Sequence, residues 1–324
     1  MNQVNKPDKD KIKETYKKFY NHLAIAQLKN QSSFLYDIYN QYNRDLEAAN
    51  IVLYYKKKLH NEILREKDND LDFEISLKKF WINCKNSKDI PIKIIEISKE
   101  TVLPKETARR KVQLLISKKI FKKNNNKISW ELSDDDKVFQ NKLMEKEIAQ
   151  LAKLIKIFCD YLKINLNLSN INESIKNNFS FFWYHYLKYQ LIYLKTWQIK
   201  LHDLELLLIL TECSLQSFQR QNKYNYDFQT HFNINKENVV ETNLLSSTFL
   251  SEMTGLPRAT CIRKLNTLTR MKFIKKDLNS KKYYLNHGFF SNEFEKQEEK
   301  LLEIFSEFFL IVLKALTREN FLKG

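Results

Sequence analysis

Apolar side chains recur at three- to four-residue spacing through most of this 324-residue chain, which is the pattern of helices that bury one face. Two short stretches that alternate apolar and polar residues predict two-stranded ribbons. The predicted helices are Phe34–Arg65, Leu71–Cys84, Ile92–Lys99, Pro104–Lys118, Asp135–Leu162, Phe179–Lys200, His202–Phe218, Ser247–Thr254, Pro257–Met271 and Asn292–Leu316. The predicted ribbons pair Ile120–Lys123 with Lys127–Leu132 and Phe273–Lys276 with Lys281–Leu285. The pattern therefore predicts a mainly α protein with two small β wings.

One segment of the chain occurs twice. Residues 98–132 align with residues 251–285 at a constant shift of 153, and 13 of the 35 pairs are identical. Because this period has the length of a whole domain, we expect a duplicated domain. The expected domains are 1–165, with its motif at 91–132, and 166–324, with its motif at 246–286. A polar insertion at about 219–241 predicts an exposed loop in the second copy.

The composition narrows the class of protein. Three glycines and four prolines are too few for most sandwiches, Rossmann sheets and barrels, and 43% apolar residues are too many for a disordered chain. No apolar run reaches 18 residues, and the start of the chain up to Lys18 is polar, unlike a signal peptide. The four cysteines lie far apart, so we expect buried reduced thiols and no zinc site. We expect a cytoplasmic, nucleoid-associated protein of a bacterium, phage or plasmid, without a cofactor or membrane contact.

The positive charge is concentrated in the two motifs. The chain has a net charge of +16; residues 91–132 carry 11 basic against 4 acidic residues, and residues 246–286 carry 9 against 2. Each motif therefore has a net charge of +7, and the rest of the chain is nearly neutral. A general lysine bias would not place the charge in this way, so the pattern indicates a polyanionic partner.

The second helix of each motif separates into two faces when its residues are placed at 100° steps. The apolar face is formed by Ala108, Val112 and Leu115 in the first copy and by Cys261, Leu265 and Leu268 in the second. The opposite face carries Glu106, Arg109, Arg110 and Gln113, and its counterpart carries Ala259, Ile262, Arg263 and Asn266. Solvation alone explains one such face, but this one occurs twice, each time between a tight turn and a basic ribbon. The recurrence predicts nucleic-acid binding.

The stretches Thr101–Val112 and Thr254–Leu265 resemble the helix-turn-helix of bacterial winged-helix transcription regulators. The order of helices, ribbon and long final helix resembles the MarR family, whose members are about one copy long. The resemblance implies two winged helix-turn-helix domains joined by long helices in a pseudo-two-fold arrangement. One chain would then be a monomer that acts as a dimer, or would itself form a homodimer. Lys119 and Lys272 stand where that family usually has glycine, and the wing arginines are replaced by Ile128 and Ser129 or by Lys281 and Lys282.

The residue types on these surfaces suit double-stranded DNA. Arg109, Arg110 and Arg263 are expected to bond guanine, Gln113 and Asn266 adenine, and Glu106 cytosine. Ile262, beside Ala259, is expected to meet a thymine methyl group. The expected phosphate contacts are Lys105, Lys111, Arg258 and Lys264 on the helices and Lys122, Lys123, Lys275, Lys276, Lys281 and Lys282 on the wings. These residues predict a sequence-specific transcriptional regulator.

Other functions remain open at this point. A plasmid or phage replication initiator with tandem winged helices would show the same motifs, and a third alternative is a module that binds protein. Catalytic signals are weak: phosphate-binding glycine loops are absent, and Asp134–Asp136 is better explained as the acidic start of a helix than as a magnesium site. The aromatic run Phe179–Trp197 is expected to be core and not an effector pocket. We therefore expect no enzymatic activity, and no effector can be named.

Overall fold

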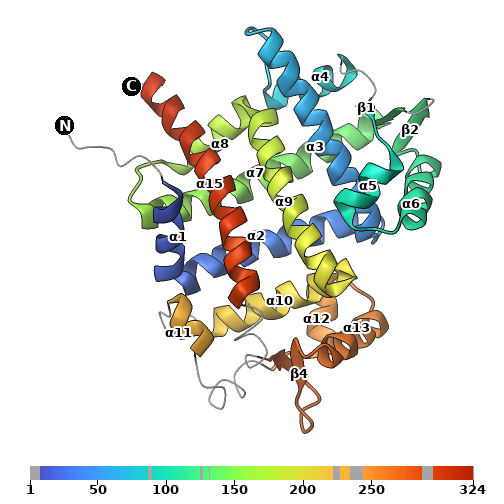
Figure 1. Cartoon of the computed structure of the whole chain (residues 1–324), viewed down its shortest axis with the longest axis vertical. Coiled ribbons are helices and arrows are strands. Elements are labelled where there is room, and N and C mark those ends of the chain that lie inside the picture. Colours follow the sequence, from blue (N-terminus) through green and yellow to red (C-terminus); the bar gives the residue numbers. More distant parts are fainter. Residues whose placement is uncertain are drawn as a thin grey trace. The chain divides into compact units, whose positions relative to one another are not determined.

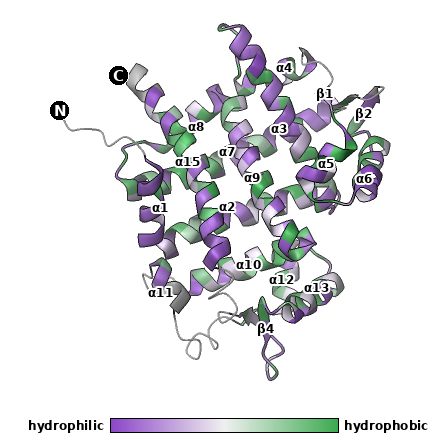
Figure 2. Cartoon of the chain, in the orientation of Figure 1, coloured by the Kyte–Doolittle hydropathy of each residue, from purple (hydrophilic) through white to green (hydrophobic). Residues whose placement is uncertain are grey.

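The protein is mainly helical, with small antiparallel sheets, as the sequence predicts (Figure 1). The computed structural model describes residues 8–86, 90–124, 127–130, 132–221, 227–233, 244–286 and 295–323. Polar and apolar positions alternate along the helices, which is visible as changes of colour in Figure 2. Among the described residues, no helix has the length and hydropathy that a bilayer-spanning segment needs.

The chain forms two compact units, and neither coincides with one half of the sequence. Unit 1 consists of Met1–Asn40, Ile157–Asn165 and Asp203–Leu310. Unit 2 consists of Gln41–Lys156, Leu166–His202 and Ile311–Gly324. Each unit therefore combines segments from both expected domains, 1–165 and 166–324.

Unit 2 contains the first motif. Its elements are α3 (Leu46–Asn69), the 3-10 helix η1 (Leu77–Lys79), α4 (Phe80–Asn86), β1 (Ile90–Pro91), α5 (Ile94–Thr101), α6 (Lys105–Ser117), β2 (Phe121–Asn124), β3 (Lys127–Trp130), most of α7 (Asp134–Leu162), α8 (Leu168–Asn177) and α9 (Phe179–Leu201). Helices α3 and α9 lie side by side, and α5 packs against both. Most aromatic side chains of α9, including Phe179, Phe182 and Trp183, are buried, while Phe181 and Tyr184 are half-buried, so the prediction that this run forms core is confirmed for most of its residues.

Unit 1 contains the second motif. Its elements are α1 (Lys9–Lys18), α2 (Tyr20–Gln41), α10 (Leu204–Gln221), α11 (Phe228–Asn233), α12 (Ser247–Thr254), α13 (Arg258–Arg270), β4 (Ile274–Lys276), β5 (Tyr283–Leu285) and the first part of α15 (Glu295–Lys323). Helix α10 packs against α12 and α13. Part of the expected loop at 219–241 is helical, because α10 extends to Gln221 and α11 follows; residues 222–226 and 234–243 lie outside the described residues.

In each unit a helix from one half of the sequence contacts helices from the other half. In unit 2, α9 of the second half packs on α3 and α5 of the first. In unit 1, α2 of the first half contacts α10 of the second half: the Oγ of Ser32 donates to Glu212 on α10 over 2.8 Å. A Cβ at Gly255, after α12, would lie 3.5 Å from the ring of Tyr36 on α2. Each half of the sequence therefore contributes a helix to the unit that contains the motif of the other half.

Two predicted helices are wrong in their extent. The predicted helix Phe34–Arg65 is broken, because Asn43 and Arg44 have φ angles of 54° and 62° and Asp45 caps a new helix by accepting from the N–H of Ala48. The predicted helix Leu71–Cys84 is reduced to the short η1 and α4, and Leu71 is exposed. The periodicity also missed α1, the first part of α2, and α8.

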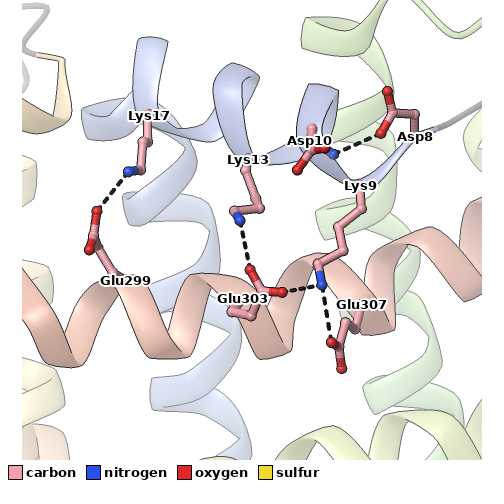
Figure 3. Close-up of polar contacts among 8 residues, drawn as sticks. All are labelled: Asp8, Lys9, Asp10, Lys13, Lys17, Glu299, Glu303 and Glu307. Atoms are coloured by element: carbon pink, nitrogen blue, oxygen red, sulfur yellow. Dashed lines mark hydrogen bonds and ion pairs between the residues drawn. The ribbon is translucent and has the colours of Figure 1, made fainter.

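Helix α1 is attached to α15 by a ladder of ion pairs within unit 1 (Figure 3). Its lysines at every fourth position face glutamates on the antiparallel helix. Lys13 lies 2.7 Å from Glu303, Lys17 lies 2.8 Å from Glu299, and Lys9 pairs with both Glu303 and Glu307. Ile12 and Tyr16 are buried on the same helix, so the ladder borders an apolar contact.

Candidate nucleic-acid interface

The turn between the two short helices has the same construction in both motifs. Residue Val102 after α5 and Gly255 after α12 both adopt the left-handed conformation, with φ of 58° and 70°. The hydroxyl of Ser98 donates to the carbonyl of Leu103 over 2.6 Å, and Ser251 donates to Leu256 over the same distance. A proline with φ near −54° then precedes the second helix in each copy. The turns therefore fix α6 and α13 in the same way relative to their partners.

The inward faces of α6 and α13 are those predicted from the sequence. Ala108, Val112 and Leu115 on α6 are buried, as are Cys261, Leu265 and Leu268 on α13. This assignment of faces is confirmed, and it determines which side chains of these two helices can reach a partner.

The outward face of each helix is open to solvent. On α6 the exposed residues are Glu106, Arg109, Arg110 and Gln113, and on α13 they are Ala259, Arg263 and Asn266, while Ile262 is half-buried. Arg109 lies 3.1 Å from Glu106 one turn away, so part of its charge is neutralised on the helix itself. Arg110 and Arg263 occupy the same position of the repeat and project from the same face.

The flanking basic residues divide into two kinds. Lys105 and Arg258, at the start of each helix, are exposed. Lys111 and Lys264 are not: only 16% and 13% of their side chains remain accessible. From the sequence, all four were expected to contact phosphates. In the structure, Lys111 and Lys264 instead form ion pairs with carboxylates of their own unit.

The same three-residue clamp holds both of these lysines. The Nζ of Lys111 lies 2.7 Å from Asp45 and 3.0 Å from Glu47, at the start of α3. In unit 1, Lys264 forms the equivalent two ion pairs at the start of α10. It pairs with Asp203, and its Nζ lies 2.9 Å from Glu205.

The clamp keeps both lysines charged. Burial lowers the pKa of Lys111 and Lys264, but the hydrogen bonds to the two carboxylates outweigh it and leave the pKa raised in each case. The charge of each lysine is thus paired with two carboxylates of the protein itself.

The clamp was not predicted from the sequence, although the sequence contains a repeated tripeptide that indicates it. The tripeptide Asp-Leu-Glu occurs at Asp45–Glu47 and again at Asp203–Glu205. The shift between these copies is 158 residues and not the 153 of the motif, so a search at constant shift does not align them. The repeat therefore extends to α3 and α10, which are equivalent helices.

Exposed lysines lie on and beside both ribbons. Lys122 and Lys123 on β2 are exposed, and so are Lys275, Lys276, Lys281 and Lys282 around the second ribbon. In unit 2, β1 extends the ribbon to the order β1-β3-β2, with Ile90 opposite Ile128. A bridge between Leu245 and Tyr283 takes the equivalent place in unit 1. Ribbon residues 125–126 lie outside the described part of the chain.

The lysines before the ribbons adopt a backbone conformation that glycine favours. Lys119 has a φ of 56° and Lys272 a φ of 65°, both in the left-handed region that favours glycine. The two motifs thus share this backbone conformation at equivalent positions of the repeat.

Acidic side chains and thiols are the remaining candidate reactive groups among the described residues. The described residues contain no group of three His, Cys, Asp or Glu side chains placed to hold a metal ion. Ser133 caps α7 by accepting from the N–H of Asp136, whose carboxylate accepts in turn from the N–H and hydroxyl of Ser133, and Asp134 pairs with Lys137. The free cysteines Cys159, Cys213 and Cys261 are buried, and Cys84 is half-buried. The acidic triplet is therefore used in starting a helix.

The fold and this site define a mainly helical protein that carries two equivalent helix pairs, each followed by a small antiparallel ribbon. No family model matches the chain, and no match was found among the curated proteins or the solved structures.

Proposed function

We propose that this protein is a sequence-specific regulator that binds double-stranded DNA through two winged helix-turn-helix heads. Helices α6 and α13 are the reading helices, and the ribbons are the wings. The heads belong to one chain and are connected through its long helices, so one molecule carries two reading surfaces.

The observation that carries this proposal is the repeated pair of a clamped lysine and an exposed arginine. Lys111 and Lys264 fix the reading helix to the start of α3 or α10, and the adjacent Arg110 and Arg263 point outward. An arginine held on a rigid helix can bond the guanine edge with both of its donors, and the major groove admits such a helix. The exposed wing lysines supply the attraction to phosphates.

Selection from a random duplex pool, followed by affinity measurements over a salt series, tests the proposal. Arg263→Ala is expected to weaken the selected duplex by about 1–3 kcal/mol and to relax base choice at one position. The matched control is Arg65→Ala, which removes an exposed arginine on α3, outside both motif segments, and is expected to leave the affinity unchanged.

The wings are tested by the double variant Lys281→Ala and Lys282→Ala. It is expected to weaken selected and scrambled duplexes alike and to reduce the salt slope by about two, one per phosphate contact. If wild-type protein selects no sequence, or if Arg263→Ala behaves like the control, the proposal is wrong. Mapping of binding sites in a genome then separates a promoter-binding regulator from a replication initiator, which would occupy origin repeats.

A further inference from the structure

The most exposed large apolar side chain of the described residues is at the tip of the second ribbon. Leu278, in the connection between β4 and β5, is 88% accessible. Figure 1 shows this connection projecting beyond β4, away from the helices of unit 1. The leucine contributes almost no buried area to the fold, so the packing of the protein does not explain its presence.

The tip is held in a defined shape by its own hydrogen bonds. The N–H of Asp277 donates to the carbonyl of Lys282 over 2.8 Å, which closes the connection. The N–H of Ser280 donates to the carboxylate of Asp277 over 2.6 Å. Lys281 adopts a φ of 55°, which turns the chain back into β5. Leu278 therefore lies at the end of an ordered turn.

Exposed lysines lie on both sides of this leucine along the chain, beyond the neighbouring Asp277. Lys275 and Lys276 precede it, Lys281 and Lys282 follow it, and all four are exposed. A narrow basic ribbon with one apolar side chain at its end matches the minor groove, where two rows of phosphates flank the base edges. Leucine is among the side chains that enter this groove as wedges, unstack one base step and bend the duplex.

We propose that Leu278 is such a wedge and that it bends the DNA beside the half-site read by α13. This inference rests on the proposed function and specifies how the second wing binds. The first wing has Asn125 at the equivalent position of the repeat, so only the second head carries the wedge. The bend is consequently confined to one side of the binding site.

The test uses the full chain and the duplex obtained by selection. Donor and acceptor dyes on the two ends report bending, and 2-aminopurine placed at successive steps outside the α13 half-site reports unstacking. Wild-type protein is expected to shorten the end-to-end distance and to raise 2-aminopurine fluorescence at one step. Leu278→Ala is expected to abolish both signals and to weaken binding about tenfold, while Leu278→Met retains them.

The matched control is Asn279→Ala, which changes the neighbouring exposed residue of the same turn and is expected to preserve bending. Circular dichroism verifies that each variant is folded. Binding without any change of the signals in Leu278→Ala overturns the wedge and leaves the proposed function intact, whereas failure of wild type to bind any duplex overturns the proposed function. Binding of wild type to vesicles of phosphatidylcholine and phosphatidylserine that depends on Leu278, with no unstacking of DNA, reassigns the tip to a membrane surface and also overturns the wedge.

Discussion

The Nζ of Lys111 on α6 lies 2.7 Å from the Oδ2 of Asp45, the residue that caps α3. The same carboxylate accepts from the N–H of Ala48, so one side chain both starts α3 and holds α6 against it. Lys264 and Asp203 repeat this arrangement in unit 1, where the carboxylate of Asp203 accepts from the N–H of Glu205. The position of each proposed reading helix thus depends on a capping residue more than 60 positions earlier in the chain.

Removal of a clamp lysine is expected to destabilise its own unit. Lys111→Met retains the alkyl stem but leaves Asp45 and Glu47 without their cation, and should reduce the free energy of unfolding by about 1–3 kcal/mol. Denaturant titration measures the loss. The control Lys105→Met removes an exposed lysine of the same helix and should change stability little; equal losses in the two variants would contradict the clamp.

The ladder between α1 and α15 predicts a rescue by charge exchange. Lys13→Glu places a carboxylate opposite Glu303 and should lower the hydrogen-exchange protection of α1, because like charges then face each other. Adding Glu303→Lys should restore part of the protection. The effect should be larger at 50 mM than at 1 M salt, since exposed pairs are screened.

Lys11→Glu is the control for this ladder, because it makes the same charge change on α1 outside the drawn pairs (Figure 3). A loss of protection as large in this variant, or no restoration in the double variant, would show that α1 is held by Ile12 and Tyr16 alone.

The buried His60 predicts a specific loss of stability in acid. Its ring stacks on Phe80 at 5.0 Å, and burial, together with Lys56, lowers its pKa to about 3 from the usual 6.5. The unfolded chain therefore binds a proton below pH 6.5 that the folded chain does not, so this stability is present above that pH and is lost as the pH falls towards 3. His60→Phe should remove about 1.4 kcal/mol per pH unit from the slope of unfolding free energy between pH 6 and pH 4.

Carboxylates also titrate in acid, but they contribute equally to wild type and to His60→Phe. The difference between the two slopes of unfolding free energy against pH therefore reports on His60. His202→Asn is the control, because His202 is exposed and follows α9 in the left-handed conformation that asparagine tolerates. Equal slopes for wild type and His60→Phe would mean that His60 is protonated in the folded protein.

The differences between the two outward faces predict a binding site that is not a perfect palindrome. Arg110 and Arg263 are shared, but Arg109 is replaced by Ile262 and Gln113 by Asn266. Two half-sites with a common guanine and different neighbours should emerge from selection, and Arg110→Ala should relax one of them while Arg263→Ala relaxes the other. Recovery of a symmetric palindrome would contradict this expectation.

The sequence determined the local features of the molecule. Periodicity predicted α5, α6, α12 and α13 within a few residues, because each of these helices buries a continuous apolar stripe whose spacing is written in the chain. The constant-shift repeat located both motifs, and the buried Cys261 and exposed Arg263 follow from their places on one helix. These properties depend on residues only a few positions apart.

Tertiary structure decided which surfaces meet. Hydrophobic spacing shows that α3 and α9 each have an apolar face, but not that one covers the other, because many apolar faces can pair with similar gain. The same holds for charge. The sequence shows that Lys111 and Lys264 lie beside a basic face, but only the fold brings close the carboxylates with which these lysines form ion pairs. The break at Asn43 and Arg44 also depends on tertiary structure. Helical periodicity continues on both sides of it, so the helix ends there only because capping and packing together outweigh the gain from continuing the helix.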